Sequence, residues 1–91
     1  MDTANQPKIL LVDDEESIVS TLKLFLSLSG FQVVTAGNGI EALDRVTEHH
    51  PDLVVLDVLM PQLDGRETLR RLRQRGDWTP VILLTQVDSA P

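Results

Sequence analysis

The fold of this chain is decided by residues 8–14, Lys8-Ile9-Leu10-Leu11-Val12-Asp13-Asp14, together with residues 53–57, Leu53-Val54-Val55-Leu56-Asp57. Each apolar run is too short for a helix and is typical of a strand buried on both faces of a parallel sheet. If the two strands are neighbours, Asp13, Asp14 and Asp57 converge at one edge of the sheet. Because three carboxylates repel one another unless a cation lies among them, this pattern indicates a divalent-metal and phosphate site.

The rest of the chain alternates between helical and strand patterns. Apolar residues at helical spacing predict a helix from Glu15 to Ser29 that turns one face inward and is closed by Gly30. Asn38 is a candidate N-cap of the next helix, which ends near residues 49–50. The remaining predicted elements are strands at 31–35 and 80–85 and a basic helix at 66–75.

The order β-α-β-α-β-α-β predicts a parallel sheet with right-handed crossovers. In open sheets of this kind the ligand lies beyond the carboxyl ends of the strands. Thr85 falls at such an end, as do the three aspartates.

Composition excludes several classes of protein. The 91 residues suffice for one domain, and the 42% apolar content fits a globular one. A net charge of −6 disfavours nucleic acid as a direct partner. No apolar run approaches the roughly 20 residues of a membrane span. Residues 1–7 are polar and are expected to form a loose tail without signal-peptide character, and the absence of cysteine is compatible with the cytoplasm.

Three blocks of sequence, in this order, carry a family resemblance. They are Val12-Asp13-Asp14-Glu15, then Leu56-Asp57-Val58-Leu59-Met60-Pro61 with Asp64-Gly65, then Leu84-Thr85. Together they resemble the receiver domain of bacterial two-component response regulators, over residues 8 to about 88. The resemblance implies a flavodoxin-like doubly wound α/β fold with strand order 2-1-3-4.

The resemblance also implies a role for each matching residue. Asp57 would accept a phosphoryl group from a phosphohistidine of a sensor histidine kinase or a histidine phosphotransfer protein. Asp13, Asp14, Asp57 and the backbone carbonyl of Leu59 would bind Mg²⁺, and the Thr85 hydroxyl would hydrogen-bond the phosphoryl group. Such a domain is a switch more than an enzyme, at most phosphorylating and dephosphorylating itself. Ser17, Ile18 and Thr21 on the first helix are candidate contacts with the kinase.

The sequence departs from the family pattern in two respects. Receiver domains usually have five βα units, whereas the pattern over residues 8–91 extends only to a fourth strand. We therefore expect a partial receiver domain without the fourth helix, the fifth strand, the fifth helix and the family's phosphate-neutralising lysine. Gln86 also replaces the small residue that usually follows the threonine. Without the last units the sheet has an open edge, which predicts either a longer protein or self-association through that edge.

Two alternatives stay open from the sequence. The segment could be an assembly or dimerisation module that is not phosphorylated. It could also be a metal-dependent phosphohydrolase, but such enzymes generally need an acid two residues after the nucleophile, where this chain has Leu59. His49-His50 and the arginines of residues 66–75 are more simply interpreted as solvated helix residues than as metal or nucleic-acid ligands.

Overall fold

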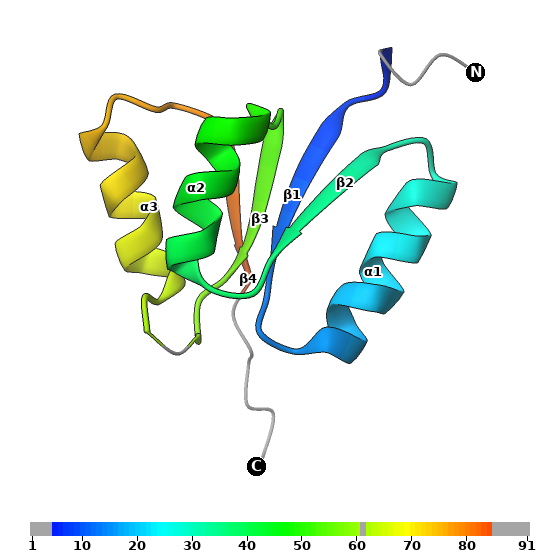
Figure 1. Ribbon diagram of the computed structural model, residues 1–91, viewed down its shortest axis with the longest axis horizontal. Helices are drawn as coiled ribbons and strands as arrows, with labels where there is room; N and C mark the ends of the chain where they lie inside the picture. The colour runs from blue at the N-terminus through cyan, green and yellow to red at the C-terminus, as the bar shows by residue number, and fades with distance from the viewer. Residues whose placement is uncertain (1–4, 61, 85–91) are drawn as a thin grey trace.

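The computed structural model describes residues 5–60 and 62–84, which form a parallel sheet with helices on both faces (Figure 1). The strands are β1 (Lys8–Val12), β2 (Gln32–Ala36), β3 (Leu53–Asp57) and β4 (Val81–Leu84), and the helices are α1 (Glu16–Leu28), α2 (Gly39–His49) and α3 (Gly65–Gln74). Within these residues the sheet has the order β2-β1-β3-β4, which confirms the predicted 2-1-3-4 arrangement.

The register of the sheet aligns the carboxyl ends of its strands. In the two parallel pairs made by β1, Val12 lies opposite Ala36 of β2 and opposite Leu56 of β3. Asp13 follows directly after β1, and Asp57 is the last residue of β3. The two predicted site residues therefore leave the sheet side by side.

The hydrophobic core lies between the sheet and the layer formed by α2 and α3. Its fully buried members come from β1, β3 and both helices, and include Leu10, Val12, Val46, Val54, Leu56 and Leu72. The partly buried side chains of Val81 and Leu83 extend this core onto β4. Burial of the sheet and of these two helices is therefore the main stabilising term of the fold.

Helix α1 covers the opposite face of the sheet less completely. It packs on β1 and β2, and none of its side chains is fully buried. Ile18, Val19, Leu22 and Leu26 are half-buried, whereas Phe25 and Leu28 are 67% and 80% exposed. The helical spacing of apolar residues over 15–29 includes Phe25 and Leu28 and predicts that they face inward; this prediction was wrong, because the apolar part of α1 is wider than its contact with two strands.

Local signals set the helix ends as predicted. Gly30 adopts φ +97° after α1, and the Phe31 N–H donates to the Leu26 carbonyl, which completes a left-handed C-terminal cap. The Asn38 side chain accepts a hydrogen bond from the Glu41 N–H at 2.9 Å, which confirms Asn38 as an N-cap.

Two smaller predictions need correction. Strand β2 begins at Gln32, one residue later than predicted, because the Phe31 N–H is used by the α1 cap. The sequence predicts an apolar stripe of Ile40, Leu43 and Val46 on α2; Val46 is buried and Leu43 packs partly buried against the core, whereas Ile40 is 52% exposed and Ala42 is buried in addition. No helix in the described part of the chain is long and apolar enough to cross a bilayer.

Candidate functional site

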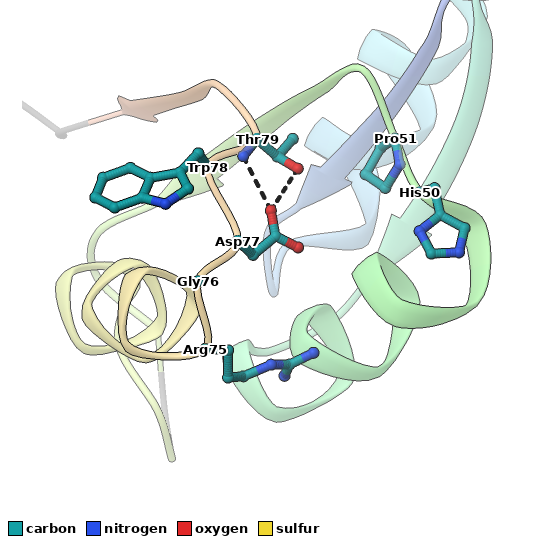
Figure 2. Close-up of a pocket in the computed structure, with 7 residues that line it drawn as sticks. All are labelled: His50, Pro51, Arg75, Gly76, Asp77, Trp78 and Thr79. Carbon is teal, nitrogen blue, oxygen red and sulfur yellow. Dashed lines mark hydrogen bonds between the residues drawn. The ribbon is translucent and has the colours of Figure 1, made fainter.

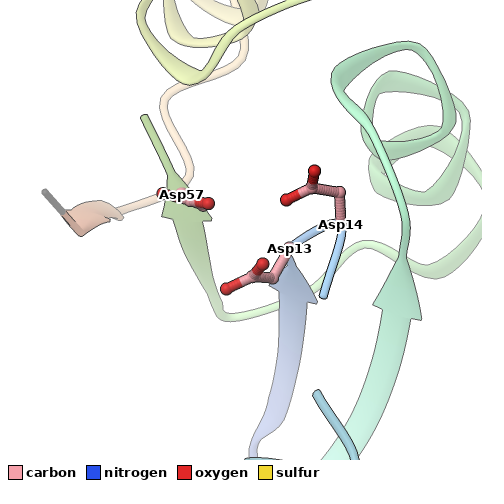
Figure 3. A group of neighbouring side chains, drawn as sticks. All are labelled: Asp13, Asp14 and Asp57. Carbon is pink, nitrogen blue, oxygen red and sulfur yellow. The ribbon is translucent and has the colours of Figure 1, made fainter. Parts of the chain in front are cut away.

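Three aspartates meet at the carboxyl edge of the sheet, as predicted. One oxygen from each of Asp13, Asp14 and Asp57 lies within 4.8 Å of the other two. Figure 3 shows their carboxylates turned toward a common space beyond the ends of β1 and β3. The cluster therefore joins two parts of the sequence that are more than forty residues apart.

The geometry of the first two aspartates follows from the way β1 turns into α1. The Asp13 N–H donates to the Ala36 carbonyl at 3.2 Å, which extends the β1–β2 ladder by one residue. One oxygen of Asp13 accepts a hydrogen bond from the Glu15 N–H at 3.0 Å, which fixes the side chain as the chain turns. Asp13 is buried and Asp14 is exposed, so the site has a fixed acid and a solvent-facing one.

Asp57 is the most buried acid of the cluster, with 4% of its surface exposed. Its Oδ1 accepts a hydrogen bond from the Leu59 N–H at 3.3 Å. Burial raises the pKa of Asp57, and the charges of Asp13 and Asp14 raise it further, against the opposing effect of the Leu59 N–H. Asp57 is therefore a constrained carboxylate whose charge is costly unless a cation compensates it.

The donor set fits Mg²⁺ by its chemistry. Mg²⁺ prefers hard oxygen ligands and binds through one or two carboxylates while it keeps waters or phosphate oxygens as further ligands. The cluster supplies carboxylate oxygens from three residues, and exposed Asp14 leaves one side open to solvent. Asp13, Asp14 and Asp57 could therefore hold one such ion beside Asp57.

The roles of two other predicted site residues, Leu59 and Thr85, stay predictions. Leu59 lies just past Asp57 with its side chain 64% exposed, and its backbone carbonyl as a metal ligand stays a prediction. Thr85 lies outside the described residues, as does Gln86. The role of the Thr85 hydroxyl therefore also stays a prediction.

One residue that positions the site was quoted in the sequence motif without a role. A Cβ on Gly65 would lie 2.3 Å from the Asp57 carbonyl oxygen and 3.0 Å from Val58 Cα. The Gly65 N–H donates to the Val58 carbonyl at 3.0 Å. Helix α3 therefore begins directly against the backbone of the central aspartate, which only a residue without a side chain permits. The Asp64-Gly65 pair was the available signal.

The comparison with known proteins decides the family. The family model of the response regulator receiver domain matches residues 9–91. The chain belongs to the response regulator receiver domain family. Receiver domains act in two-component phosphorelay signalling and generally bind Mg²⁺ at an acidic pocket, which is where the three aspartates of this chain lie.

Relatives agree with this assignment. This chain is 48% identical over 82 residues to the response regulator MprA of Mycobacterium sp. (strain KMS). The aligned region covers 90% of this chain and 36% of that protein. This chain is also 51% identical over 81 residues to the alkaline phosphatase synthesis transcriptional regulatory protein PhoP of Bacillus subtilis (strain 168). The aligned region covers 89% of this chain and 34% of that protein. The chain therefore spans about a third of the length of these curated relatives.

Solved structures show the same fold. The receiver domain of the Francisella response regulator 1452 matches with a TM-score of 0.86 and 36% identity, over 93% of this chain and 70% of that one. The response regulator TrrA of Thermotoga maritima, solved in complex with Mg²⁺-BeF, matches with a TM-score of 0.84 and 38% identity, over 91% of this chain and 72% of that one.

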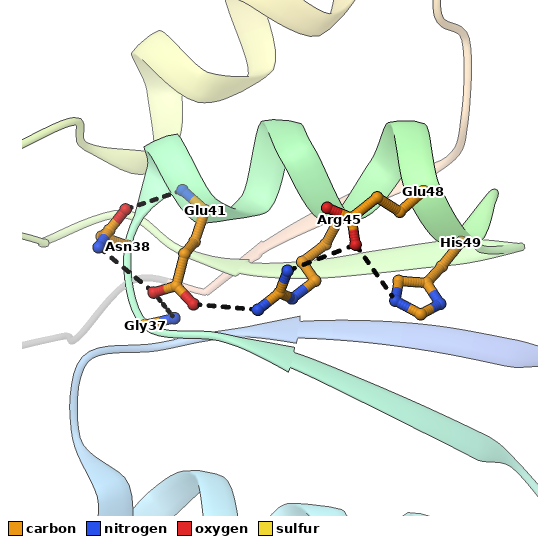
Figure 4. Close-up of polar contacts among 6 residues, drawn as sticks. All are labelled: Gly37, Asn38, Glu41, Arg45, Glu48 and His49. Carbon is orange, nitrogen blue, oxygen red and sulfur yellow. Dashed lines mark hydrogen bonds and ion pairs between the residues drawn. The ribbon is translucent and has the colours of Figure 1, made fainter.

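A hollow of about 330 Å³ adjoins the aspartate cluster of the receiver domain. It lies between the start of α1 and the end of β2, and it is bordered by Asp13, Asp14, Glu16 and Gly37. The Gly37 N–H donates to a carboxylate oxygen of Glu41, and this carboxylate also pairs with Arg45, 3.4 Å away (Figure 4). These contacts tie the loop beside the site to α2.

A second hollow, of about 450 Å³, lies at the opposite end of the sheet and contains none of the predicted site residues. Its rim includes His50, Arg75 and Trp78 (Figure 2). Asp77 accepts hydrogen bonds from the N–H and the hydroxyl of Thr79 there, at 2.9 and 2.6 Å. These bonds lower the pKa of Asp77 and fix the turn that leads into β4.

Proposed function

We propose that this receiver domain accepts a phosphoryl group on Asp57 from a phosphohistidine of a sensor histidine kinase or a histidine phosphotransfer protein. The observation that carries the proposal is the convergence of three carboxylates within 4.8 Å at the strand ends. Such a cluster has little structural value by itself, because its members repel one another. It becomes favourable when a cation and a phosphoryl group occupy the site.

The chemistry assigned to Asp57 is nucleophilic. A carboxylate oxygen attacks phosphorus in line with the bond to the histidine nitrogen, that bond breaks, and its electron pair returns to the imidazole. The product is an acyl phosphate on Asp57. The Leu59 N–H holds Oδ1 of Asp57, so the carboxylate is oriented before the donor arrives.

Mg²⁺ would be held by Asp13, Asp14 and Asp57, with the Leu59 carbonyl as a further ligand, and it would neutralise charge on the transferred phosphoryl oxygens. Exposed Asp14 faces the solvent side from which a donor would approach. The Thr85 hydroxyl is assigned to hydrogen-bond the phosphoryl group. Because the domain is modified and then reset, it acts as a switch that controls the output of a regulator and not as a turnover enzyme.

A docking surface for the phosphodonor protein is proposed at the start of α1. A largely apolar hollow of about 340 Å³ there is lined by Ser17, Ile18, Thr21 and Leu22. Helix α1 follows directly from the Asp13-Asp14 pair, so a helix of the donor seated in this hollow would lie beside the aspartate cluster. The three contacts predicted from sequence all border this hollow.

The two alternatives receive no support from the site. Leu59 occupies the position at which a phosphohydrolase would need a second acid, and its side chain points to solvent with 64% exposed. A module that serves assembly alone does not require three carboxylates that repel one another within 4.8 Å. The cytoplasmic location expected from composition stays a prediction.

The test is phosphorylation by a small phosphodonor, followed by the intact mass of the protein. We expect incubation with acetyl phosphate and Mg²⁺ to add one phosphoryl group, and chelation of the metal to abolish the gain. Asp57→Asn should gain nothing, because the amide is not a nucleophile. Asp44→Asn, which removes an exposed acid on α2, is the matched control and should behave as the wild type. Equal gain in Asp57→Asn and the wild type would refute the proposal.

A further inference from the structure

The loop that borders the aspartate cluster contains one peptide group that is contacted on both sides. This group joins Ala36, the last residue of β2, to Gly37. Its carbonyl accepts a hydrogen bond from the Asp13 N–H at 3.2 Å. Its N–H donates to Oε2 of Glu41 at 3.3 Å (Figure 4). Because the N–H and the C=O of a trans peptide point in opposite directions, Asp13 and Glu41 hold the same rigid unit from opposite sides.

The backbone of Asp13 is held by this peptide group. Asp13 is the first residue after β1, and its bond to Ala36 continues the ladder of hydrogen bonds past the end of the strand. The carboxylate of Asp13 is held separately, by the Glu15 N–H at 3.0 Å. One contact therefore fixes the backbone of Asp13 and the other fixes its side chain. A shift of the peptide between Ala36 and Gly37 would move the Asp13 carboxylate relative to Asp57.

Glu41 is itself held in place on α2. Arg45 pairs with Glu41 at 3.4 Å and with Glu48 at 3.5 Å. The pairing balances the charge of Glu41, so its carboxylate binds the Gly37 N–H without adding an uncompensated negative charge beside the cluster. Gly37 is exposed, so water would satisfy its N–H if Glu41 were removed. A water molecule, however, would not hold the peptide in one orientation.

Capping of α2 alone does not account for this contact. Glu41 lies three residues after the N-cap Asn38, the position from which a glutamate commonly returns to the N–H of the N-cap residue. The Glu41 N–H is bound by Oδ1 of Asn38 at 2.9 Å, whereas the Glu41 carboxylate reaches the Gly37 N–H, one residue before the N-cap. The carboxylate therefore contacts the same peptide group that binds Asp13.

We propose that Glu41 is a positioning residue for Mg²⁺ binding, which acts on Asp13 through the peptide between Ala36 and Gly37. The inference rests on the proposed function, because it assigns Asp13 to the metal site. Loss of the Glu41 carboxylate releases this peptide, and the cluster is then less well ordered before the cation arrives. Groups that orient a metal ligand are commonly worth about tenfold to a hundredfold in metal affinity. Because one peptide group separates Glu41 from Asp13, we expect an effect of about tenfold.

A Mg²⁺ titration of the isotope-labelled chain, followed by heteronuclear NMR, tests the proposal. It measures the dissociation constant for Mg²⁺ and, in the metal-free protein, the chemical shift of the Asp13 amide. Glu41→Ala should shift the Asp13 amide resonance without metal and raise the dissociation constant about tenfold. Glu41→Gln keeps an oxygen that accepts from the Gly37 N–H, so it should recover most of the lost affinity.

Glu48→Ala is the matched control, because it removes the same charge from the same helix and breaks a pairing with the same Arg45. It should leave the Asp13 resonance and the dissociation constant unchanged, and the dispersion of amide resonances shows that each variant is folded. A folded Glu41→Ala that binds Mg²⁺ as tightly as the wild type would overturn the proposal. So would an equal loss in Glu48→Ala, or a Glu41→Gln as weak as Glu41→Ala. These outcomes leave the proposed function standing, whereas a wild type that binds no Mg²⁺ would overturn both.

Discussion

Replacing Asp14 by asparagine should make the metal-free protein more stable and should remove its stabilisation by Mg²⁺. Asp14 is the exposed member of the cluster, and it faces the carboxylates of Asp13 and Asp57 within 4.8 Å. Asparagine keeps the shape of the side chain and removes its charge. The substitution therefore isolates the electrostatic cost of bringing three acids together.

The magnitude follows from Coulomb's law. Two unit charges separated by 4.8 Å interact by about 1 kcal/mol in water and by about 3.5 kcal/mol at an effective dielectric constant of about 20. The exposure of Asp14 favours the lower figure. The charge of Asp14 is also a smaller cause of the raised pKa of Asp57 than burial is. With two neighbouring carboxylates, Asp14→Asn should raise the free energy of unfolding by about 1–2 kcal/mol without metal.

Urea denaturation followed by circular dichroism, with chelator and with Mg²⁺, measures both effects. At a Mg²⁺ concentration of about one hundred times its dissociation constant, the wild type should gain about 2.7 kcal/mol and become the more stable of the two proteins. Asp44→Asn should change neither the metal-free stability nor the Mg²⁺ response. The reasoning is refuted if Asp14→Asn destabilises the metal-free protein, or if Mg²⁺ stabilises the variant as much as the wild type.

Three further predictions concern the positions that support the site and the fold. Gly65→Ala should lower the free energy of unfolding by about 1–3 kcal/mol and slow phosphorylation by acetyl phosphate, because its Cβ collides with the backbone beside the site, whereas Gly37→Ala should leave both nearly unchanged. Asn38→Ala should cost about 1 kcal/mol in urea denaturation through loss of the α2 N-cap, and an unchanged midpoint would contradict that role. The hydrogen bonds from Thr79 lower the pKa of Asp77, so their contribution is present at neutral pH and is lost as the pH falls through that lowered pKa. Asp77→Ala should therefore cost about 1 kcal/mol near pH 7 and progressively less in acid, and a deficit that does not depend on pH would count against this account.

The sheet and the aspartate cluster could be predicted because their signals are local and strong. The run of residues 53–57 is uniformly apolar and ends in an acid, and the structure has a strand over the same five residues. Parallel strands end at a common edge, so the placement of Asp13 beside Asp57 followed from topology alone.

The predictions that failed depended on which surfaces meet. Phe25 and Leu28 have the apolar character of core residues, but their burial depends on what packs beside α1, which periodicity does not specify. The closeness of Gly65 to the Asp57 carbonyl depends on how α3 returns to the sheet. The start of β2 was displaced because a helix cap and a strand compete for one N–H, that of Phe31.

The most direct test of the account is to locate the phosphoryl group. The acyl phosphate formed with acetyl phosphate and Mg²⁺ can be trapped with a nucleophile such as hydroxylamine and assigned by peptide mass spectrometry. The account predicts one modified residue, Asp57, and no modification when the metal is chelated. Modification at Asp13 or Asp14 instead, or the absence of any modified carboxylate, would contradict it.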